Sequence, residues 1–303
     1  PDRPSRTAGG RRAALLVALI VLLALISTYF LFFRQRTASP SAAPDGQAAP
    51  PRTSVAIFPF APAAGSEAAA WIGESVPILL SLSLEDHSDL RVLTPERLHD
   101  LSVQIGGASA APELEVARRG EAEYLLRGTV TGPVGEARLQ AEWVRVASGQ
   151  AEKQWEVTGI GEATLGARLD DLANHVREQL ALGERDPDDP RLAGLVPIKE
   201  APLKSFVAGS TLLARGDAPG ALTRLADAVA VPDFHLAHFT QALAAAQSGD
   251  RLAALGATKR LEDASRALPV RVTLLAPALA ELYAGGNPRE AVGPLENFLA
   301  RFP

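Results

Sequence analysis

The sequence predicts a single transmembrane helix, then an α+β sheet domain, and then an all-α domain of helical repeats. Three observations predict this order: residues 13–33 carry no charge, residues 54–183 alternate short apolar runs with amphipathic stretches, and a glycine-centred motif recurs within residues 201–303. Two polar, Pro-rich stretches separate these parts, namely an Ala/Pro/Ser-rich tether at residues 34–53 and a linker at residues 184–200.

The apolar run AALLVALIVLLALISTYFLFF, residues 13–33, is long enough to cross a bilayer. Its 21 residues would span about 31 Å as a helix. A cleavable signal peptide is the alternative, but its apolar region would be about 7–15 residues long and would end in small residues. Four arginines precede the run and two follow it closely, which predicts a single-pass protein of the bacterial inner membrane with residues 1–12 in the cytoplasm and residues 37–303 in the periplasm. A homodimer, if one forms, is expected to form through the membrane region.

The composition excludes several classes of function. The 303 residues include no Cys, which excludes disulfides, thiol nucleophiles and zinc–thiolate sites. They include no Met either, and the first residue is Pro1, so we expect the sequence to be a segment of a longer protein. Residues 1–52 hold seven Arg and two Asp, which leaves a net charge of −10 on residues 53–303 of a chain whose total is −5. An acidic surface repels phosphate backbones, so no nucleic-acid partner is expected for residues 53–303.

Within residues 54–183 the pattern predicts one sheet with helices packed on one of its faces. The stretch SVAIFPF has the pattern of a buried strand, and three closely spaced strands after residue 123 are joined by the hairpin-length turns GPVG and SGQ. Thr94 before Pro95 is expected to cap a helix, and Gly120 to end one. The expected strands are 54–60, 90–93, 124–131, 136–147 and 151–159, and the expected helices are 68–84, one from residue 95, 112–120 and 165–180. The three tryptophans are expected to fill the core: Trp71, Trp143 and Trp155.

A family resemblance rests on four stretches of this region. They are SVAIFPF, WIGESVPILLSLSLEDHSDLRVLTPERL, AEYLLRGTV and EARLQAEWVRVASGQAEKQWEV. In their pattern and order, over about 130 residues, they resemble TolB N-terminal-like domains of the CadC and FlgO type. The resemblance implies an extracytoplasmic α+β domain of a membrane-anchored bacterial regulator. The cytoplasmic part of such a regulator is a winged-helix domain, a serine/threonine kinase or a class III nucleotide cyclase, including cyclases of putative peptide-modification systems.

The last part, residues 201–303, repeats a motif of Gly, then Asp or Asn, then Ala five residues after the Gly. The spacings of 33 and 37 residues between successive motifs bracket the 34-residue period of helix–turn–helix repeats. Gly would end one helix in a left-handed conformation, Asp or Asn would cap the next, and Ala would let the two helices approach. The segments resemble about three tetratricopeptide repeats, which implies a concave groove that binds a peptide or a protein; an irregular all-helical domain is the alternative. The motifs are Gly216-Asp217 with Ala221, Gly249-Asp250 with Ala254, and Gly286-Asn287 with Ala291.

No pattern in the sequence predicts catalysis, a metal or a cofactor. Ser75 lies in GESVP, which departs from the G-x-S-x-G nucleophile elbow at its last position. His235 and His238 are three residues apart on an expected helix, but no further metal ligands accompany them, so we expect them to contact a partner in the groove. The three aspartates of the linker lack the Gly and the terminal Glu of a calcium loop, and a solvated linker is expected there.

The sequence favours a non-enzymatic function for residues 1–303. We expect the membrane-anchored, extracytoplasmic sensing region of a bacterial signalling regulator, which binds a protein or peptide partner through the sheet domain and the repeats. The output domain, expected upstream of this segment, would be an adenylate or guanylate cyclase or a protein kinase. The alternative is an envelope scaffold or assembly protein without a signalling output.

Overall fold

The structure is a computed structural model of the chain. It describes residues 52–85, 87, 89–106, 112–183, 189–262, 268–283 and 289–301. These residues all belong to a unit that extends over residues 50–303. The predicted juxtamembrane segment, the predicted transmembrane helix and nearly all of the predicted tether lie outside the described residues.

The predicted fold class and location are corrected by the helices that the structure describes. The longest of them have 15 residues, whereas about 20 apolar residues are needed to cross a bilayer. Within the described ranges, therefore, no helix is long and apolar enough to span a membrane. The prediction of a single-pass inner-membrane protein with a periplasmic part was wrong by this finding. What the structure supports is an α+β protein built on one mixed sheet.

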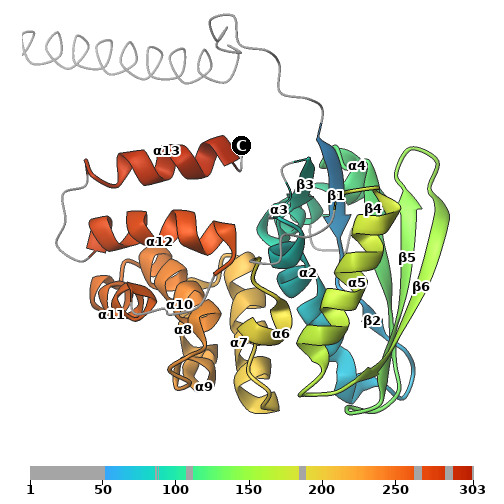
Figure 1. Ribbon diagram of the computed structural model, residues 1–303, viewed down its shortest axis with the longest axis horizontal. Coiled ribbons are helices and arrows are strands. Elements are labelled where there is room, and N and C mark those ends of the chain that lie inside the picture. Colours follow the sequence, from blue (N-terminus) through green and yellow to red (C-terminus); the bar gives the residue numbers. More distant parts are fainter. Residues whose placement is uncertain are drawn as a thin grey trace, which may run out of the picture. The chain divides into compact units, whose positions relative to one another are not determined.

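The sheet has the strand order β3-β1-β4-β5-β6, and the short β2 pairs with β4 (Figure 1). β1 is parallel to both β3 and β4. The antiparallel meander predicted from the two hairpin-length turns is confirmed, because β4 pairs with β5 and β5 with β6. The strands are β1 Thr53–Ile57, β2 Ala61–Pro62, β3 Leu90–Leu93, β4 Tyr124–Thr131, β5 Ala137–Arg145 and β6 Gln150–Ile160.

Helices cover both faces of the sheet, where the sequence predicts helices on one face only. Leu125 and Leu126 are neighbours on β4 and point to opposite faces, yet both are fully buried. Leu126 belongs to the core under α2 and α5, together with Trp143. Leu125 belongs to a second core, on the side of α3 and α4. The helices of this part are the 3₁₀ turn Glu67–Ala69, α2 Ala70–Leu84, α3 Pro95–Gly106, α4 Glu113–Arg119 and α5 Leu165–Gln179.

Helix α2 is buried along most of its surface, with only Glu74 exposed, and it packs against the sheet, α5 and α7. Against the sheet, the backbone N–H of Phe60 donates to the carbonyl oxygen of Gly73 at 3.1 Å. A Cβ atom at Gly73 would lie 2.0 Å from the Phe60 carbonyl oxygen, so only glycine allows this approach. On its other side α2 packs against α7, where the ammonium of Lys204 lies 5.5 Å from the centre of the Trp71 ring.

Helices α7 to α13 form successive pairs within the described residues, α7 with α8, α10 with α11 and α12 with α13 (Figure 1). The first two predicted turns are confirmed. Gly216 and Gly249 are left-handed, with φ of 79° and 76°, and the carboxylates of Asp217 and Asp250 accept N–H groups of the following helix at 2.9 and 3.0 Å. The third motif, Gly286-Asn287, lies outside the described residues. The helices are α6 Leu192–Leu195, α7 Glu200–Ala214, α8 Ala218–Arg224, α9 Ala226–Val229, α10 His235–Ser248, α11 Arg251–Glu262, α12 Val270–Tyr283 and α13 Val292–Arg301.

Part of the predicted linker is folded against the sheet part. The carboxylate of Asp170 on α5 accepts the backbone N–H groups of Leu192 and Ala193 on α6, both at 3.2 Å, and Leu192 is fully buried. Beyond the linker, α7 packs on α2, and the sheet part and the helix pairs contribute to one hydrophobic core. A domain boundary at residues 184–200 stays a prediction.

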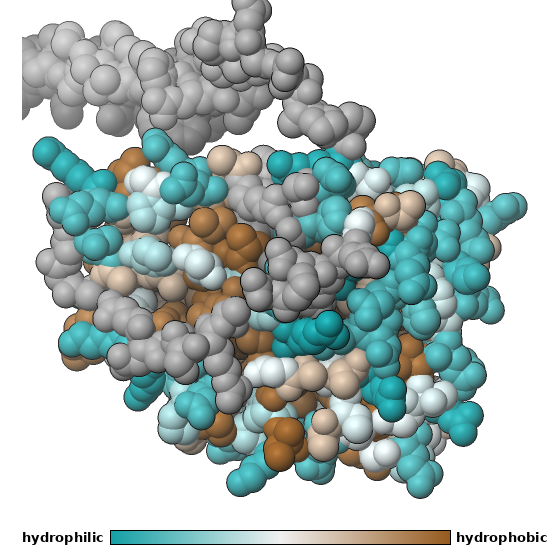
Figure 2. Space-filling model, viewed as in Figure 1, coloured by the Kyte–Doolittle hydropathy of each residue, from teal (hydrophilic) through white to brown (hydrophobic). Residues whose placement is uncertain are grey.

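The surface is hydrophilic over the β5–β6 hairpin and shows apolar residues over α12 and α13 (Figure 2). Two exposed ion pairs cross between neighbouring strands of the meander: Arg127 on β4 with Glu142 on β5 at 3.0 Å, and Arg138 on β5 with Glu156 on β6 at 3.5 Å. The exposed apolar residues of α12 and α13 are Leu282, Val292 and Leu299.

We expect the substitution Ala254→Leu to lower the free energy of unfolding by about 1–3 kcal/mol. Ala254 is fully buried on α11, which packs between α10 and α12, so a larger side chain would force these helices apart. Chemical denaturation measures the change. Ala226→Leu is the control, because Ala226 is exposed on α9 and its substitution should change the free energy by less than about 0.5 kcal/mol. Equal unfolding free energies for the two variants would contradict a close helix contact at Ala254.

Candidate functional site

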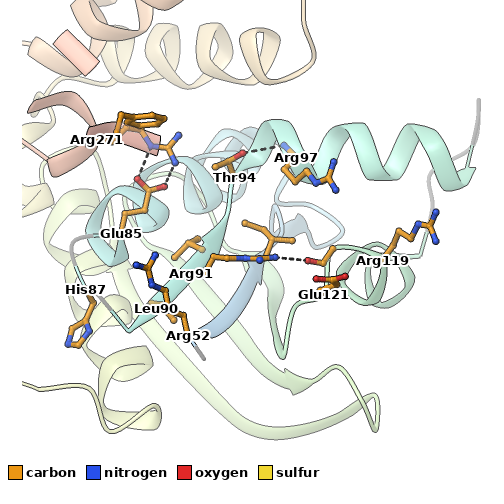
Figure 3. Close-up of a pocket in the computed structure, with 14 residues that line it drawn as sticks. Arg52, Glu85, His87, Leu90, Arg91, Thr94, Arg97, Arg119, Glu121 and Arg271 are labelled. Atoms are coloured by element: carbon orange, nitrogen blue, oxygen red, sulfur yellow. Dashed lines mark hydrogen bonds and ion pairs between the residues drawn. The ribbon is translucent and has the colours of Figure 1, made fainter. Parts of the chain in front are cut away.

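A pocket of about 570 Å³ extends along β3, which is an edge strand of the sheet (Figure 3). All four residues of β3 line it. The rest of its wall comes from the ends of elements on both sides of β3: the C-terminal end of α2, the first turn of α3 and the C-terminal end of α4. Arg271 of α12 and Phe298 of α13 add residues from the helix pairs. The pocket is therefore built by both parts of the protein.

Arginine dominates the charge of this pocket. Five arginines line it, against two glutamates. Figure 3 shows Arg97 and Arg119 at one end, Arg271 paired with Glu85 at the other, and Arg91 between them. The lining arginines are Arg52, Arg91, Arg97, Arg119 and Arg271, and the glutamates are Glu85 and Glu121. This concentration of positive charge occurs in a chain whose net charge is −5.

Arg91 is held in place by the turn that follows α4. Its guanidinium donates a hydrogen bond from Nη2 to the carbonyl oxygen of Gly120 at 3.1 Å. A Cβ at Gly120 would lie 2.3 Å from Cδ2 of Leu93 on β3, so a larger residue here would require the Leu93 side chain to move. The absence of a side chain at Gly120 lets the end of α4 lie against β3, and this contact forms one wall of the pocket.

The same turn places Glu121 in a left-handed conformation, with φ of 58°. The sequence predicts that Gly120 ends α4, but Gly120 has a φ of −78° and the left-handed residue is the next one. Two hydrogen bonds close the helix end, from the N–H of Glu121 to the carbonyl of Arg118 and from that of Ala122 to that of Ala117. A left-handed glutamate costs about 1–2 kcal/mol relative to a right-handed one, and here it sets the rim of the pocket.

Glu85 and Arg271 form a bidentate ion pair that joins the two parts of the protein. Nε and Nη2 of Arg271 donate to the two carboxylate oxygens of Glu85 at 2.8 and 2.6 Å. The side chains are 4% and 18% exposed, for Glu85 and Arg271 respectively, so the pair is nearly shielded from water. Removing one partner of such a pair typically costs about 3–5 kcal/mol, because the other charge stays buried. The pair fixes α12 against the end of α2 and so closes one end of the pocket.

Thr94 connects β3 to α3 and orients Arg97. The sequence predicts Thr94 as the cap of α3, and this is confirmed by the bond from the N–H of Arg97 to Oγ1 of Thr94 at 3.3 Å. Arg97 is therefore in the first turn of α3, and its exposed side chain lines the pocket. Arg119 is in the last turn of α4 and is also exposed. These two cations face the solvent side of the pocket, where a ligand would enter.

The two predicted site residues lie elsewhere, on α10. His238 is fully buried, and its Nε2 lies 3.1 Å from the carbonyl oxygen of Pro232. A carbonyl can only accept a hydrogen bond, so Nε2 carries the proton, and Nδ1 is a buried acceptor without a partner among the described residues. His235 is partly exposed. Because its side chain is fully buried, His238 does not present a surface to a partner in this structure. The partner-binding role of His235 stays a prediction.

The face of the helix pairs that was predicted to bind a peptide is covered within the chain. α7 and α10 turn apolar side chains toward α2 and the start of α3, among them Phe206 and Phe239 opposite Ile78 and Leu82. The space left between these helices is a cavity of about 80 Å³. The sheet part therefore occupies the position expected for a peptide in the repeat groove.

The structure also places the residues weighed for catalysis and for the core. Ser75 is fully buried, and its hydroxyl donates to the carbonyl of Ile72 on the same helix at 2.6 Å, so it is not exposed as a nucleophile. Trp143 is fully buried and Trp71 nearly so, as predicted, whereas Trp155 is only half-buried and stacks on His175. Within the part of the chain that the structure describes, no three His, Asp or Glu side chains are placed to hold a metal ion.

No protein-family profile matches the sequence, and no curated protein matches it. Among solved structures, the chain is similar to the LpoB C-terminal domain from Escherichia coli, with 20% sequence identity and a TM-score of 0.29, over 38% of this chain and 86% of that one. It is also similar to the PelC dodecamer from Paraburkholderia phytofirmans, with 21% identity and a TM-score of 0.27, over 44% of this chain and 90% of that one. At these TM-scores the similarities carry no argument about function. The resemblances to TolB N-terminal-like domains and to tetratricopeptide repeats stay predictions.

We expect the protein to lose stability as the pH falls below about 6.5 because of His238. Burial holds the pKa of His238 below its usual value of 6.5, more strongly than the hydrogen bond to Pro232 raises it. Below pH 6.5 the unfolded chain therefore binds a proton that the folded chain resists, and the stabilisation, complete above that pH, is lost as the pH approaches the lowered pKa.

Denaturation of the parent protein and of His238→Phe at several pH values between 8 and about 5 measures this effect. The variant should show a smaller fall in unfolding free energy toward low pH, because it has no imidazole to protonate. His235→Phe, on the same helix, is the matched control. The charge of His235 is a lesser cause of the lowered pKa of His238, so this variant should change the slope less than His238→Phe does. Identical slopes for the parent protein and His238→Phe would contradict the assignment.

Proposed function

We propose that residues 50–303 are a binding unit for a protein partner, and that the partner places an acidic segment in the arginine-lined pocket along β3. The observation that carries this proposal is the gathering of five arginines around one pocket of an acidic chain. These arginines come from five separate points of the sequence between residues 52 and 271, so the fold brings them together.

The chemistry of the pocket favours carboxylates on a polypeptide. Guanidinium groups bind carboxylates in a bidentate manner, as Arg271 does with Glu85 in the wall of the same pocket. Leu90, Val92 and Phe298 add apolar surface between the charges, which suits a segment with mixed side chains. A nucleic acid is disfavoured because its phosphate backbone would extend beyond the pocket over a unit whose residues 53–303 carry a net charge of −10. A short acidic segment, in contrast, contacts only the arginines of the pocket.

Binding alone accounts for the pocket, and the proposal assigns it no reaction. The buried carboxylate of Glu85 is already paired with Arg271. Of the two hypotheses drawn from the sequence, the scaffold or assembly protein requires only partner binding, and we adopt it. The signalling hypothesis requires in addition an output domain outside these residues.

We expect a fluorescent peptide in which glutamate alternates with valine to bind the protein, and a peptide with lysine in place of glutamate not to bind. The double substitution Arg97→Glu with Arg119→Glu should weaken binding of the acidic peptide about tenfold or more, which corresponds to about 1.4 kcal/mol. Binding should also weaken with added salt, because both arginines are exposed and their charges are screened. Fluorescence anisotropy measures both effects.

Arg118→Glu is the matched control for this experiment. Arg118 precedes Arg119 on α4 but does not line the pocket, and it pairs with Glu115 at 2.7 Å. The control should bind the acidic peptide with an affinity close to that of the parent protein. An equal loss of affinity in Arg118→Glu, or no binding of the acidic peptide to the parent protein, would show that the pocket is not the site.

A further inference from the structure

The sheet has two edges among the described strands, and they differ in charge and surroundings. β6 is one edge. Its glutamates Glu152 and Glu156 pair with Arg145 and Arg138 of β5, and Lys153 lies between them, so this edge does not gather charge of one sign. β3 is the other edge, and it borders the arginine-lined pocket along its whole length of four residues. In the described part of the chain, β3 has a neighbouring strand on one side only, namely β1.

The backbone of β3 directs hydrogen-bonding groups into this pocket. The N–H of Thr53 on β1 donates to the carbonyl of Asp89 at 3.0 Å, and in a parallel ladder every second residue turns its backbone groups to the same neighbour. Asp89, Arg91 and Leu93 therefore face β1. Leu90 and Val92 face the opposite side, where the pocket lies.

One of these outward groups is already bonded within the chain. The N–H of Leu90 donates to the carbonyl oxygen of His87 at 3.3 Å. The carbonyl of Leu90 and both backbone groups of Val92 remain directed to the pocket. Buried or half-buried backbone groups require partners, and an added strand supplies them in the right order.

We propose that the acidic segment of the partner binds in an extended conformation, as an additional strand paired with β3. This inference rests on the proposed function and adds the conformation of the partner. The four residues of β3 span about 13 Å, long enough to pair with a short strand. Carboxylates on one face of that strand recur at every second residue, so successive ones meet Arg91 on β3 and the two cations at one end of the pocket, Arg97 and Arg119.

The positive charge of the pocket favours a partner's acidic segment over a second copy of the chain. A second copy of the chain offers its edge strand β6 as an alternative strand, and a dimer would then form through β3. A partner segment is favoured because it brings carboxylates to the arginines without bringing the net negative charge of a second copy, −5 over the whole chain, close to the first.

Backbone methylation of the peptide tests this inference apart from the proposed function. Three peptides of alternating glutamate and valine are compared: one unmodified, one N-methylated at every valine and one N-methylated at every glutamate. In a strand paired with β3, either the valines or the glutamates direct their N–H groups toward β3, but not both. Methylation of that set removes the hydrogen bonds and should lower the affinity at least tenfold, whereas methylation of the other set should leave most of the affinity. Equal affinity of all three peptides would overturn strand pairing while leaving the acidic-segment proposal intact. Failure of the unmodified peptide to bind would overturn both.

Amide hydrogen exchange of the protein gives a second readout that does not depend on modified peptides. Peptide binding should slow the exchange of the Val92 N–H at least tenfold and leave that of Arg91, which is directed to β1, nearly unchanged. Light scattering of the free protein should give the mass of a monomer. An unprotected Val92 N–H in the saturated complex, or a dimer that dissociates when the peptide is added, would overturn the inference.

Discussion

The structure depends on one constraint, which is that α2 must be covered on nearly every side. Eleven of its fifteen residues are buried, most of them apolar, and Glu74 is the one residue of the helix that is exposed. A helix of this kind is stable in water only as an interior layer. The sheet covers one side through the close approach of Gly73 to Phe60, and α5 and α7 cover the others. The position of every helix pair relative to the sheet follows from this demand.

The arginine-lined pocket is a consequence of the same arrangement. Because α2 lies between the sheet and α7, its C-terminal end is close to both β3 and the first turn of α12, and Glu85 can reach Arg271. The pocket therefore exists only where the sheet part and the helix pairs are docked together. Its charge is opposite to that of the chain as a whole, so the pocket attracts anions locally although the net charge of the chain is negative.

Much of the fold follows from local patterns in the sequence, and the site does not. The meander, the helix after residue 164, the cap at Thr94 and the left-handed glycines Gly216 and Gly249 were predicted because each is encoded by a few adjacent residues. The helices α3 and α4 were predicted, but their placement on the second face of the sheet was missed. The adjacent leucines Leu125 and Leu126 indicate two covered faces, and the prediction of a single covered face did not use this signal. The candidate site was missed because Arg52, Arg91 and Arg271 share no local pattern, whereas the spacing of His235 and His238 gave a local signal elsewhere.

The ion pair of Glu85 and Arg271 has a consequence for how α2 and the helix pairs are aligned. Apolar surfaces such as those of α2 and α10 can slide along each other with little change in buried area. A shift by one helical turn, about 5.4 Å, would separate the two charges and leave each without its partner in a water-poor environment. We infer that the ion pair stabilises only one alignment of α2 with the helix pairs. The apolar surfaces hold the two parts together, and the carboxylate of Glu85 with the guanidinium of Arg271 determines how they are aligned.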